Sequence, residues 1–426
     1  MAVSRRTALS AAASIAAAGG VHAETEPAAG DGSPTINLGV VGLGGRGSGA
    51  VADSLTANDN ARLVAVAELD GDRAAGTLRD YRQRFGDRID VADDQVHVGL
   101  DAYRRVLDDD RVDVVLLCTP PGFRPLHLRD AVAAGKHVFA EKPVCVDPVG
   151  YRSCLETADA ADAAGLSIVT GTQYRRQTNF VEAIGKIHNG AIGDVVSATS
   201  RYCTRGMWFK PRRDGMSDAE YQLFNWMHFI WLSGDQITEQ AVHNIDVMNW
   251  LMDDRPVEAF GVGGRFTRPE GSEMWDSMAI DYRYPGDRFI SFKCRHIPNS
   301  TTDNDTIVQG TDGAALLRSF SSGSRLYDRS GEEIWSAKGS IAEAYREEHR
   351  VLVAAATGGE PVNDLRQTAD SSLTAVMGRL AAYTGQNVTW DFVANESKLE
   401  TFPEGLTLDS SLPAAQHAVP GTTELV

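Results

Sequence analysis

A glycine-rich turn at residues 42–47 is the first feature of the sequence that could do chemistry. It directly follows a short β-type run, Ile36 to Val41, and has the spacing GxGxxG. Glycines at these positions allow a tight turn and bring backbone N–H groups close to a pyrophosphate, at the N-terminus of the helix expected through Leu55. The pattern predicts dinucleotide binding, with a ligand-free glycine turn as the alternative. Its residues are Gly42, Leu43, Gly44, Gly45, Arg46 and Gly47.

An acidic residue ends the second β-type run, which extends from Arg62 to Ala67. Glu68 follows that run, and Asp70 lies just beyond it. A carboxylate here accepts hydrogen bonds from adenosine ribose hydroxyls and repels a 2′-phosphate, so we expect NAD rather than NADP. Arg73 is near enough to weaken this exclusion, and either acid could instead cap the helix that starts near Asp72.

A lysine beside a proline is the first catalytic candidate. Doubly wound sheets bind ligands at the carboxyl ends of their strands. Two segments follow predicted strands there, Cys118-Thr119-Pro120-Pro121 and Glu141-Lys142-Pro143. The prolines stop the strands and fix loops where a nicotinamide would lie. We therefore expect Thr119, Pro120, Glu141 and Lys142 to border the cofactor. A surface lysine beside a turn proline is the alternative interpretation of Lys142.

A second group of ionisable residues occurs in segment 239–246. On one continuous helix, Glu239, His243 and Asp246 stand at i, i+4 and i+7 and share a face. The surrounding residues are mostly apolar, so such a helix is largely buried and its ionisable face needs a polar pocket. We interpret His243 as a catalytic residue in that pocket, with a core histidine beside a local acid as the alternative.

Residues suited to binding a sugar lie close by in the sequence. Four of the seven tryptophans, Trp208, Trp226, Trp231 and Trp250, fall within 43 residues. Indole rings suit the apolar C–H faces of sugars, whereas Arg and Gln side chains satisfy hydroxyls. Tryptophans are nevertheless more often core or interface residues. The predicted substrate contacts are Gln173, Tyr174, Arg175, Trp208 and Asp246.

Alternating β-type and helical segments predict an α/β domain at residues 35–172. Apolar runs at 112–117, 137–140 and 166–170 alternate with helical segments, which is typical of a doubly wound parallel sheet, the Rossmann arrangement. Farther along, the β-type runs at 258–264, 277–284, 289–295 and 305–310 indicate an antiparallel sheet. Helices are expected near 341–357 and 365–383, and residues 401–426 are expected to form a loose tail.

Several of these motifs together resemble one known family. The GLGGRG turn, the acid-ended second strand, Ala134-Gly135-Lys136-His137-Val138 and Glu141-Lys142-Pro143 are similar to the glucose-fructose oxidoreductase / inositol dehydrogenase / rhizopine-catabolism (Gfo/Idh/MocA) family. The resemblance implies a Rossmann domain followed by a larger α+β domain, residues 173–400, with an open, mainly antiparallel sheet. It also implies NAD or NADP as cofactor, a sugar or cyclitol as substrate, and a homo-oligomer paired through the open sheets.

The resemblance also implies roles for three residues. The lysine of the Glu-Lys-Pro segment is catalytic in the family and lies beside the nicotinamide, which corresponds to Lys142. A family Asp-x-x-x-His pattern supplies a substrate-binding carboxylate and the general base. His243 matches that pattern, but Glu239 stands where Asp is usual. His243 would take a proton from a sugar hydroxyl that Lys142 holds, while Glu239 orients the substrate. The departure at Glu239 leaves room for a non-catalytic, NAD-containing sugar-binding protein.

The first 23 residues resemble a twin-arginine export signal. Arg5-Arg6 precedes a weakly apolar, alanine-rich stretch, and Val21-His22-Ala23 offers a cleavage site; a disordered N-terminus is the alternative. Residues 24–34 then read as a linker. We therefore expect export to the periplasm or cell envelope.

Export would change what a nicotinamide enzyme can do, because free NAD is not expected outside the cytoplasm. We therefore expect a tightly bound cofactor and a redox-neutral cycle that oxidises one sugar and reduces another. The alternative is an NAD-dependent glycoside hydrolase that acts by transient oxidation of its substrate.

Composition excludes several other classes of protein. The 426 residues include 41 Lys+Arg and 58 Asp+Glu, and the resulting net charge of −17 disfavours nucleic-acid binding. No apolar run of membrane-spanning length is evident, so we expect no membrane insertion. Five scattered cysteines without a CxxC pair fit neither a disulfide framework nor a zinc ribbon, and we expect no metal.

Overall fold

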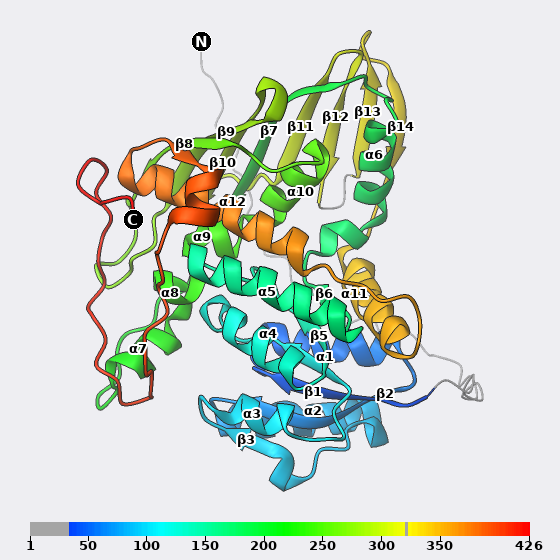
Figure 1. The fold of residues 1–426 in the computed structure, drawn as a ribbon, viewed down its shortest axis with the longest axis vertical. Coiled ribbons are helices and arrows are strands. Elements are labelled where there is room, and N and C mark those ends of the chain that lie inside the picture. Colours follow the sequence, from blue (N-terminus) through cyan, green and yellow to red (C-terminus); the bar gives the residue numbers. More distant parts are fainter. Residues whose placement is uncertain (1–33, 320–322) are drawn as a thin grey trace, which may run out of the picture. The chain divides into compact units, whose positions relative to one another are not determined.

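The N-terminal part of the chain forms a six-stranded parallel sheet in the order β3-β2-β1-β4-β5-β6 (Figure 1). The computed structural model describes residues 34–319 and 323–426, so the predicted export signal lies outside the described residues. The apolar runs of the sequence supply the central strands, which are almost entirely buried. The strands are β1 (Ile36–Val41), β2 (Ala61–Glu68), β3 (Val96–Val98), β4 (Val114–Leu117), β5 (His137–Ala140) and β6 (Ile168–Thr170).

Helices cover both faces of this sheet. Val115 and Leu117 of β4 pack in one core cluster with α3, α4 and α5, whereas Val114 and Leu116 pack in another with α1, α2 and α11. Because successive strand side chains point to opposite faces, the two clusters lie on the two sides of the sheet. The helices are α1 (Gly45–Ala57), α2 (Gly71–Phe85), α3 (Ala102–Leu107), α4 (Arg124–Ala133), α5 (Pro148–Ala164) and α11 (Ile341–Ala356).

The second sheet has nine strands in the order β14-β13-β12-β11-β7-β10-β9-β8-β15. Its neighbouring strands are antiparallel except β7 and β10, which run parallel. The predicted fold, a Rossmann sheet followed by a mainly antiparallel one, is therefore confirmed. The strands are β7 (Val195–Thr204), β8 (Glu258–Gly264), β9 (Ser277–Tyr284), β10 (Arg288–His296), β11 (Asp305–Gly310), β12 (Gly313–Arg318), β13 (Ser324–Asp328), β14 (Glu333–Ala337) and β15 (Val388–Thr389).

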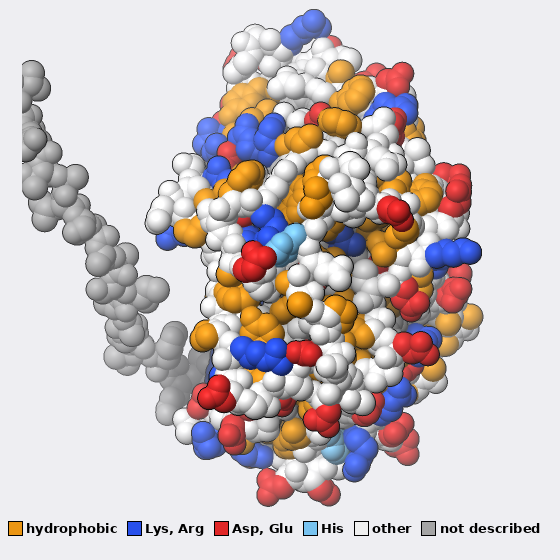
Figure 2. Space-filling view, turned by 90° about the vertical axis from the view of Figure 1, so that its left-hand side faces the viewer, with side chains coloured by type: hydrophobic (Ala, Val, Ile, Leu, Met, Phe, Trp, Pro, Cys, Tyr) orange, Lys and Arg blue, Asp and Glu red, His pale blue; other side chains and the backbone are white. Residues whose placement is uncertain are grey.

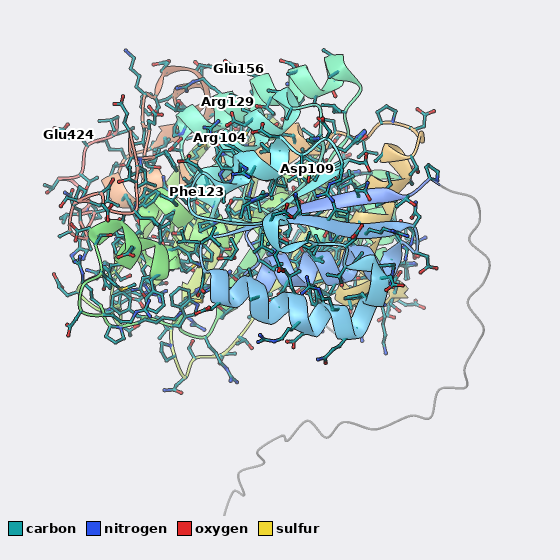
Figure 3. The ribbon with its side chains drawn as sticks, turned by 90° about the horizontal axis from the view of Figure 1, so that it is seen from below. Arg104, Asp109, Phe123, Arg129, Glu156 and Glu424 are labelled. Carbon is teal, nitrogen blue, oxygen red and sulfur yellow. The ribbon has the colours of Figure 1, made fainter. Side chains whose placement is uncertain are left out.

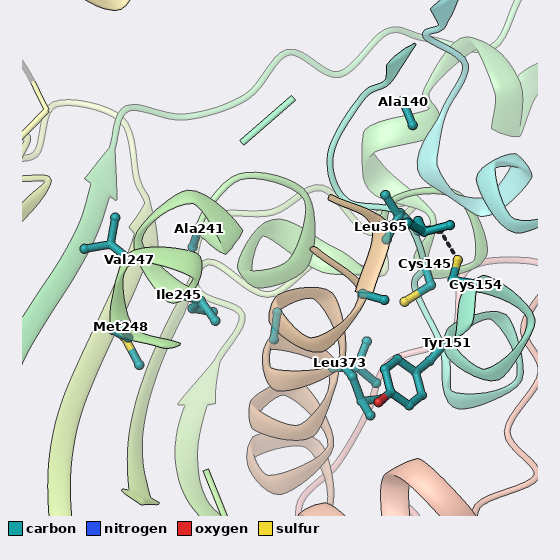
Figure 4. Packing of buried hydrophobic residues seen from close by; sticks show 14 of the residues in the cluster. Ala140, Cys145, Tyr151, Cys154, Ala241, Ile245, Val247, Met248, Leu365 and Leu373 are labelled. Atoms are coloured by element: carbon teal, nitrogen blue, oxygen red, sulfur yellow. Dashed lines mark hydrogen bonds between the residues drawn. The ribbon is translucent and has the colours of Figure 1, made fainter. Parts of the chain in front are cut away.

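A long buried helix, α12 (Leu365–Thr384), joins the two sheets. It contacts β8 and β9 of the second sheet and α5 on the first, and nearly all of its residues are buried. Figure 4 shows Leu365 and Leu373 of α12 between Tyr151 of α5 and Ile245 of α10. One apolar core thus extends from the first sheet into the second. The remaining helices are α6 (Thr178–His188), α7 (Asp218–Phe224), α8 (Ile230–Ser233), α9 (Asp235–Glu239) and α10 (Val242–Met252).

The C-terminal segment, residues 401–426, differs from the loose tail that the sequence predicts. It contains no helix or strand. Phe402 nevertheless packs against Phe123 and Trp231, with ring centroids 5.2 and 5.7 Å apart, and the Pro413 carbonyl accepts a hydrogen bond from a second-domain side chain at 2.8 Å. Its apolar residues are too sparse to give a periodic signal, so sequence patterns do not reveal this packing.

The surface carries both signs of charge. Figure 2 shows Lys, Arg, Asp and Glu side chains interspersed with apolar ones over the face in view. Arg104 of α3 and Arg129 of α4 are labelled in Figure 3. Both pair with Asp130, at 3.3 and 3.0 Å. No helix among residues 34–319 and 323–426 has the length and apolar character needed to span a membrane.

The cysteines and the other metal-ligating residues form no special site in the described part of the chain. All five cysteines are unpaired thiols. No group of three or more His, Cys, Asp or Glu side chains there has the arrangement of a metal site.

Three buried histidines generate a prediction about stability. Desolvation lowers the pKa of each, His127, His296 and His349, to about 3, against an ordinary value of 6.5. The unfolded chain therefore binds more protons, and stability is full above pH 6.5 and falls as the pH drops below it. At about pH 5.5 each histidine should cost about 1.4 kcal/mol of unfolding free energy relative to neutral pH. Urea titrations at the two pH values measure this change.

A matched variant assigns the effect. His349→Leu removes one of the three groups and should shrink the pH dependence by about a third of their combined contribution. A His349→Leu protein with the same pH dependence of unfolding free energy as wild type would contradict the assignment of His349 as buried and neutral.

Candidate functional site

A cavity of about 590 Å³ lies at the carboxyl ends of the parallel strands. The loops after β1, β2, β4 and β5 form one side, and β7, the α9–α10 region and the first turns of α11 form the other. Doubly wound sheets bind their ligands at this edge. The predicted site residues that line the cavity are Gly42, Gly44, Gly45, Arg46, Glu68, Thr119, Pro120, Glu141, Lys142, Gln173, Tyr174, Glu239 and His243.

The glycine turn leaves its backbone open on the cavity side. Gly42 has a φ of 87°, and a Cβ on Gly47 would lie 1.8 Å from the Gly42 carbonyl oxygen, so the protein's own packing requires these two glycines. In contrast, a Cβ on Gly45 would meet no atom within 4 Å, and one on Gly44 would meet only an arginine tip at 4.0 Å. The open space at the start of α1 fits a diphosphate that approaches the backbone closely.

Glu68 holds this turn in place. Its Oε2 accepts a hydrogen bond from the Leu43 backbone N–H at 2.6 Å, and its Oε1 accepts from the Asp70 backbone N–H at 3.1 Å and lies 3.4 Å from Arg73. Asp70 itself caps α2 by accepting from the Arg73 backbone at 3.1 Å, which is the alternative that the sequence left open. Glu68 lines the cavity, whereas Leu43 and Gly47, predicted as cofactor contacts, do not, because they pack inside the turn.

The loop after β4 is fixed by a buried arginine that sequence patterns did not single out. The Arg124 guanidinium donates to the Leu117 carbonyl at 2.5 Å and to the Thr119 carbonyl at 2.6 Å. The Thr119 hydroxyl also lies 3.2 Å from Nδ1 of His127. Thr119 and Pro120 therefore form a rigid edge of the cavity.

Lys142 and Glu239 join the two halves of the cavity. Lys142 Nζ lies 3.2 Å from Glu239 Oε1 and also donates to the Glu239 backbone carbonyl. Each of the two side chains is 9% exposed. A buried lysine keeps its charge only with such partners, so this pair presents an ammonium group and a carboxylate together at the cavity wall.

His243 stands beside this pair in the first turn of α10. Its ring lies 5.4 Å from that of Tyr174 and 6.4 Å from that of Tyr202. Burial, reinforced by the positive charges of Lys142 and Arg46, holds the pKa of His243 well below its usual value. The imidazole is therefore neutral at physiological pH and can accept a proton.

The predicted single helix through residues 239–246 is wrong, and the correction affects Asp246 and Arg175. Glu239 ends α9, and α10 begins only at Val242, so the face expected from i, i+4 and i+7 spacing does not exist. Asp246 instead forms a two-pronged ion pair with Arg175, at 2.8 and 2.9 Å, and neither residue lines the cavity. Both were predicted as substrate contacts; the structure makes them a buried pair in the wall behind it.

The tryptophan cluster divides between the core and the cavity. Trp208, the predicted substrate contact, is 40% exposed and lies outside the cavity, with Lys210 over its ring. The preceding residue, Met207, borders the cavity, whereas Trp208 does not. Trp231 packs in the core, whereas Trp226 lines the cavity beside Met227. The cavity is thus lined by apolar side chains as well as by ionic ones.

Two further cavity residues were missed at the sequence level. Tyr202 comes from β7 and Tyr345 from α11, and both line the cavity. On β7, buried residues, Tyr202 among them, alternate with half-buried ones, so the pattern predicts burial of Tyr202 and does not indicate a site. Tyr345 reaches the site because α11 returns to the first sheet, which no local pattern predicts.

Comparisons with known proteins place the chain in a family. Residues 36–170 match the family model described as "Oxidoreductase family, NAD-binding Rossmann fold", and residues 180–316 match "GFO/IDH/MocA C-terminal domain". An inositol 2-dehydrogenase of Gluconacetobacter diazotrophicus is 26% identical over 226 residues, 53% of this chain and 57% of that protein. The chain thus spans somewhat more than half the length of this relative. The first domain is an NAD-binding Rossmann domain.

Solved structures share the fold over most of the chain. The scyllo-inositol dehydrogenase of Lactobacillus casei with bound NAD(H) and scyllo-inositol has a TM-score of 0.64 at 17% identity, covering 83% of this chain and 99% of that one. The aldose-aldose oxidoreductase of Caulobacter crescentus complexed with glycerol has a TM-score of 0.63 at 20% identity, with the same two coverages. This chain therefore contains segments that these structures lack.

The two kinds of glycine in the turn generate a prediction. Gly45→Val places a side chain in the open space beside α1 without meeting protein atoms, so it should weaken NADH binding at least about tenfold while the unfolding temperature stays near wild type. Gly47→Ala forces a side chain onto the Gly42 carbonyl oxygen, so it should lower both the affinity for NADH and the unfolding temperature. Fluorescence titration with NADH and thermal melts separate the cases. A Gly45→Val protein that binds NADH normally would contradict a nucleotide site at this turn.

Proposed function

Because the chain belongs to the Gfo/Idh/MocA oxidoreductase family, we propose that it is a dehydrogenase that oxidises a CH–OH group of a sugar or polyol with NAD. One observation carries the proposal: Lys142 from the Rossmann half and His243 from the second half border one cavity at the carboxyl ends of the parallel strands. An ammonium group beside a neutral imidazole is the pair that alcohol oxidation needs, a holder for the oxygen and an acceptor for its proton.

The residues around the cavity fit the cofactor. The Gly42–Arg46 backbone would hold the diphosphate, Glu68 would border the adenosine ribose, and Thr119 and Pro120 would border the nicotinamide. When bound, NAD supplies the ring that accepts the hydride. The Glu68 carboxylate disfavours the 2′-phosphate of NADP and so favours NAD. Its contact with the Arg73 guanidinium weakens this preference for NAD.

The chain's own residues handle the proton. Nδ1 of His243 is buried without a hydrogen-bond partner among the described residues, and His243 lines the cavity. We infer that Nε2, which is not among the buried unpartnered atoms, is the nitrogen that faces the cavity. We assign Nε2 the role of accepting the proton of the substrate hydroxyl. Lys142 holds the oxygen as the proton leaves, and its charge disfavours a second positive charge on His243 until then. Glu239, fixed by Lys142 and by Gln240, orients the substrate.

The remaining cavity wall suits a cyclic polyol. Gln173, Tyr174 and Tyr202 offer hydrogen-bonding groups near His243, and Trp226 offers an apolar surface for the C–H face of a ring. The names of the relative from Gluconacetobacter and the structure from Lactobacillus support inositols as the first substrates to try.

We further propose that the protein is exported and returns its cofactor to the starting state in each cycle. The Arg5-Arg6 segment supports export, and the name of the Caulobacter structure, an aldose-aldose oxidoreductase, supports a cycle that oxidises one sugar and reduces another. NAD that co-purifies with protein recovered from the periplasm would support both parts, whereas a nucleotide-free cytoplasmic protein would count against them.

A homo-oligomer is also proposed. Phe260 and Val262 of β8 and Phe289 of β10 are 50%, 55% and 49% exposed on the open sheet. Apolar side chains on one sheet face support burial against a second copy of this chain. Light scattering of the purified protein tests it, with a monomer as the contrary result.

The central test is reduction of bound or added NAD to NADH by myo-inositol, scyllo-inositol and simple aldoses, each offered without a second sugar. His243→Ala should lower the rate roughly 100-fold or more, because the proton acceptor is lost, while NADH still binds. Trp208→Phe, outside the cavity, serves as the matched control and should retain activity. Oxidation of none of these compounds, or release of a sugar from an aryl glycoside without net NADH, would contradict a dehydrogenase.

The low pKa of His243 sets the pH dependence. Since the imidazole stays unprotonated well below its ordinary value of 6.5, kcat/KM should not decline as the pH falls through 6.5, and should decline only at more acidic pH. Lys142→Met removes one of the positive charges that lower this pKa, so the acid limb of its residual activity should move to higher pH. An unchanged acid limb in that variant would contradict the coupling of the two residues.

A further inference from the structure

Arg46, in the glycine turn, makes contacts that the dinucleotide fold itself does not require. Its Nε donates to Glu141 Oε1 at 2.5 Å, and its guanidinium carbon lies 4.2 Å from the centroid of the Tyr345 ring. One N–H-bearing atom, Nη2, is buried without a partner among the described residues. Nη1 also lies 4.0 Å from Asp53 Oδ2. The guanidinium is therefore held by Glu141, by the Tyr345 ring and more loosely by Asp53, and it keeps one donor for a ligand.

Glu141 is fixed on the sheet side of this arrangement. It is 4% exposed and directly precedes Lys142. A Cβ on Gly171 would lie 2.7 Å from Glu141 Oε2, so the absence of a side chain at residue 171 is what lets this carboxylate reach Arg46. The ion pair is thus built by the packing of the loops after β5 and β6.

Tyr345 is fixed on the opposite side by α11. This helix packs against α1, β5 and β6, and its residues Leu352 and Val353 belong to the core of the first sheet. Tyr345 lies near its N-terminal end, where the helix borders the cavity. Glu348, one turn farther along, is fully buried, and burial raises the pKa of its carboxyl well above the ordinary value, so Glu141 and not Glu348 is the buried anion that faces Arg46.

We propose that Arg46, Glu141 and Tyr345 form a latch that slows release of the nucleotide diphosphate from the glycine turn. The latch rests on the proposed function only in that the cavity binds NAD(H). Arg46 supplies a charged donor to the diphosphate, and Glu141 and Tyr345 keep the guanidinium from swinging away with the departing nucleotide. Because α11 comes from the far end of the chain, the second half of the protein controls how long the first half keeps its cofactor.

This assignment makes Tyr345 a positioning residue and not a catalytic one. The aromatic face, and not the hydroxyl, carries its contact with Arg46. A leucine would fill a similar volume without a π face, whereas a phenylalanine would retain it. The two substitutions thus separate the latch from a general role of Tyr345 in packing.

The test is the rate of NADH release from the full-length protein, measured by the loss of bound-NADH fluorescence after mixing with excess NAD. Tyr345→Leu should release NADH about fivefold to tenfold faster than wild type, the change expected from loss of one cation–π contact. Tyr345→Phe should release it within about twofold of wild type. Arg46→Lys, which keeps the charge but loses the planar fork, should also release faster.

Unfolding temperatures of the nucleotide-free variants control for folding. Unchanged release from Tyr345→Leu and Arg46→Lys, equal acceleration in Tyr345→Leu and Tyr345→Phe, or no NADH binding by the wild type would overturn the latch. If Tyr345→Leu fails to fold, the comparison of Tyr345→Phe with Arg46→Lys tests the latch. Equal NADH release rates in these two variants would then overturn the latch. The release rate is measured without substrate. A protein that binds NADH but oxidises none of the tested compounds would therefore contradict the proposed function, while the release rates of the variants would still test the latch.

Discussion

The ion pair between Lys142 and Glu239 is the contact on which the site depends. It joins the loop after β5 of the first sheet to the end of α9 in the second domain, with both side chains 9% exposed. Removing one partner of such a pair leaves a buried charge uncompensated, at a cost of about 3–5 kcal/mol. The pair also places an ammonium group beside His243, so one contact sets both the geometry of the cavity and the proton affinity of its imidazole.

Two cations border the cavity, and each has a carboxylate partner. Arg46 of the glycine turn pairs with Glu141, and Lys142, the next residue in the chain, pairs with Glu239. These acids hold the cations in place, and Nη2 of Arg46 keeps a donor without a partner among the described residues. Such an arrangement suits an anionic dinucleotide beside the oxygen of an alcohol. It also explains why His243 stays neutral between two cations.

Much of the fold follows from local sequence, and the failures have a common cause. The alternating runs at 258–264, 277–284 and 305–310 coincide with β8, β9 and β11, because period-2 burial is a local property. The break at Gln240 and Ala241, the pairing of Arg175 with Asp246 and the return of α11 to the first sheet are set by contacts between segments far apart in the chain. The prediction that Asp246 lies in the cavity assumed one continuous helix, and the structure has a break in that helix. Lys142, Glu239 and His243, which the motifs indicated, all line the cavity.

The most direct measurement of the central claim is a crystal structure of the protein loaded with NADH. The account predicts the diphosphate on the backbone of Gly44 and Gly45, with the nicotinamide ring between the loop at Thr119 and the side chains of Lys142 and His243. A nicotinamide ring bound away from these two nitrogens, or a glycine turn that remains closed to the diphosphate, would contradict it.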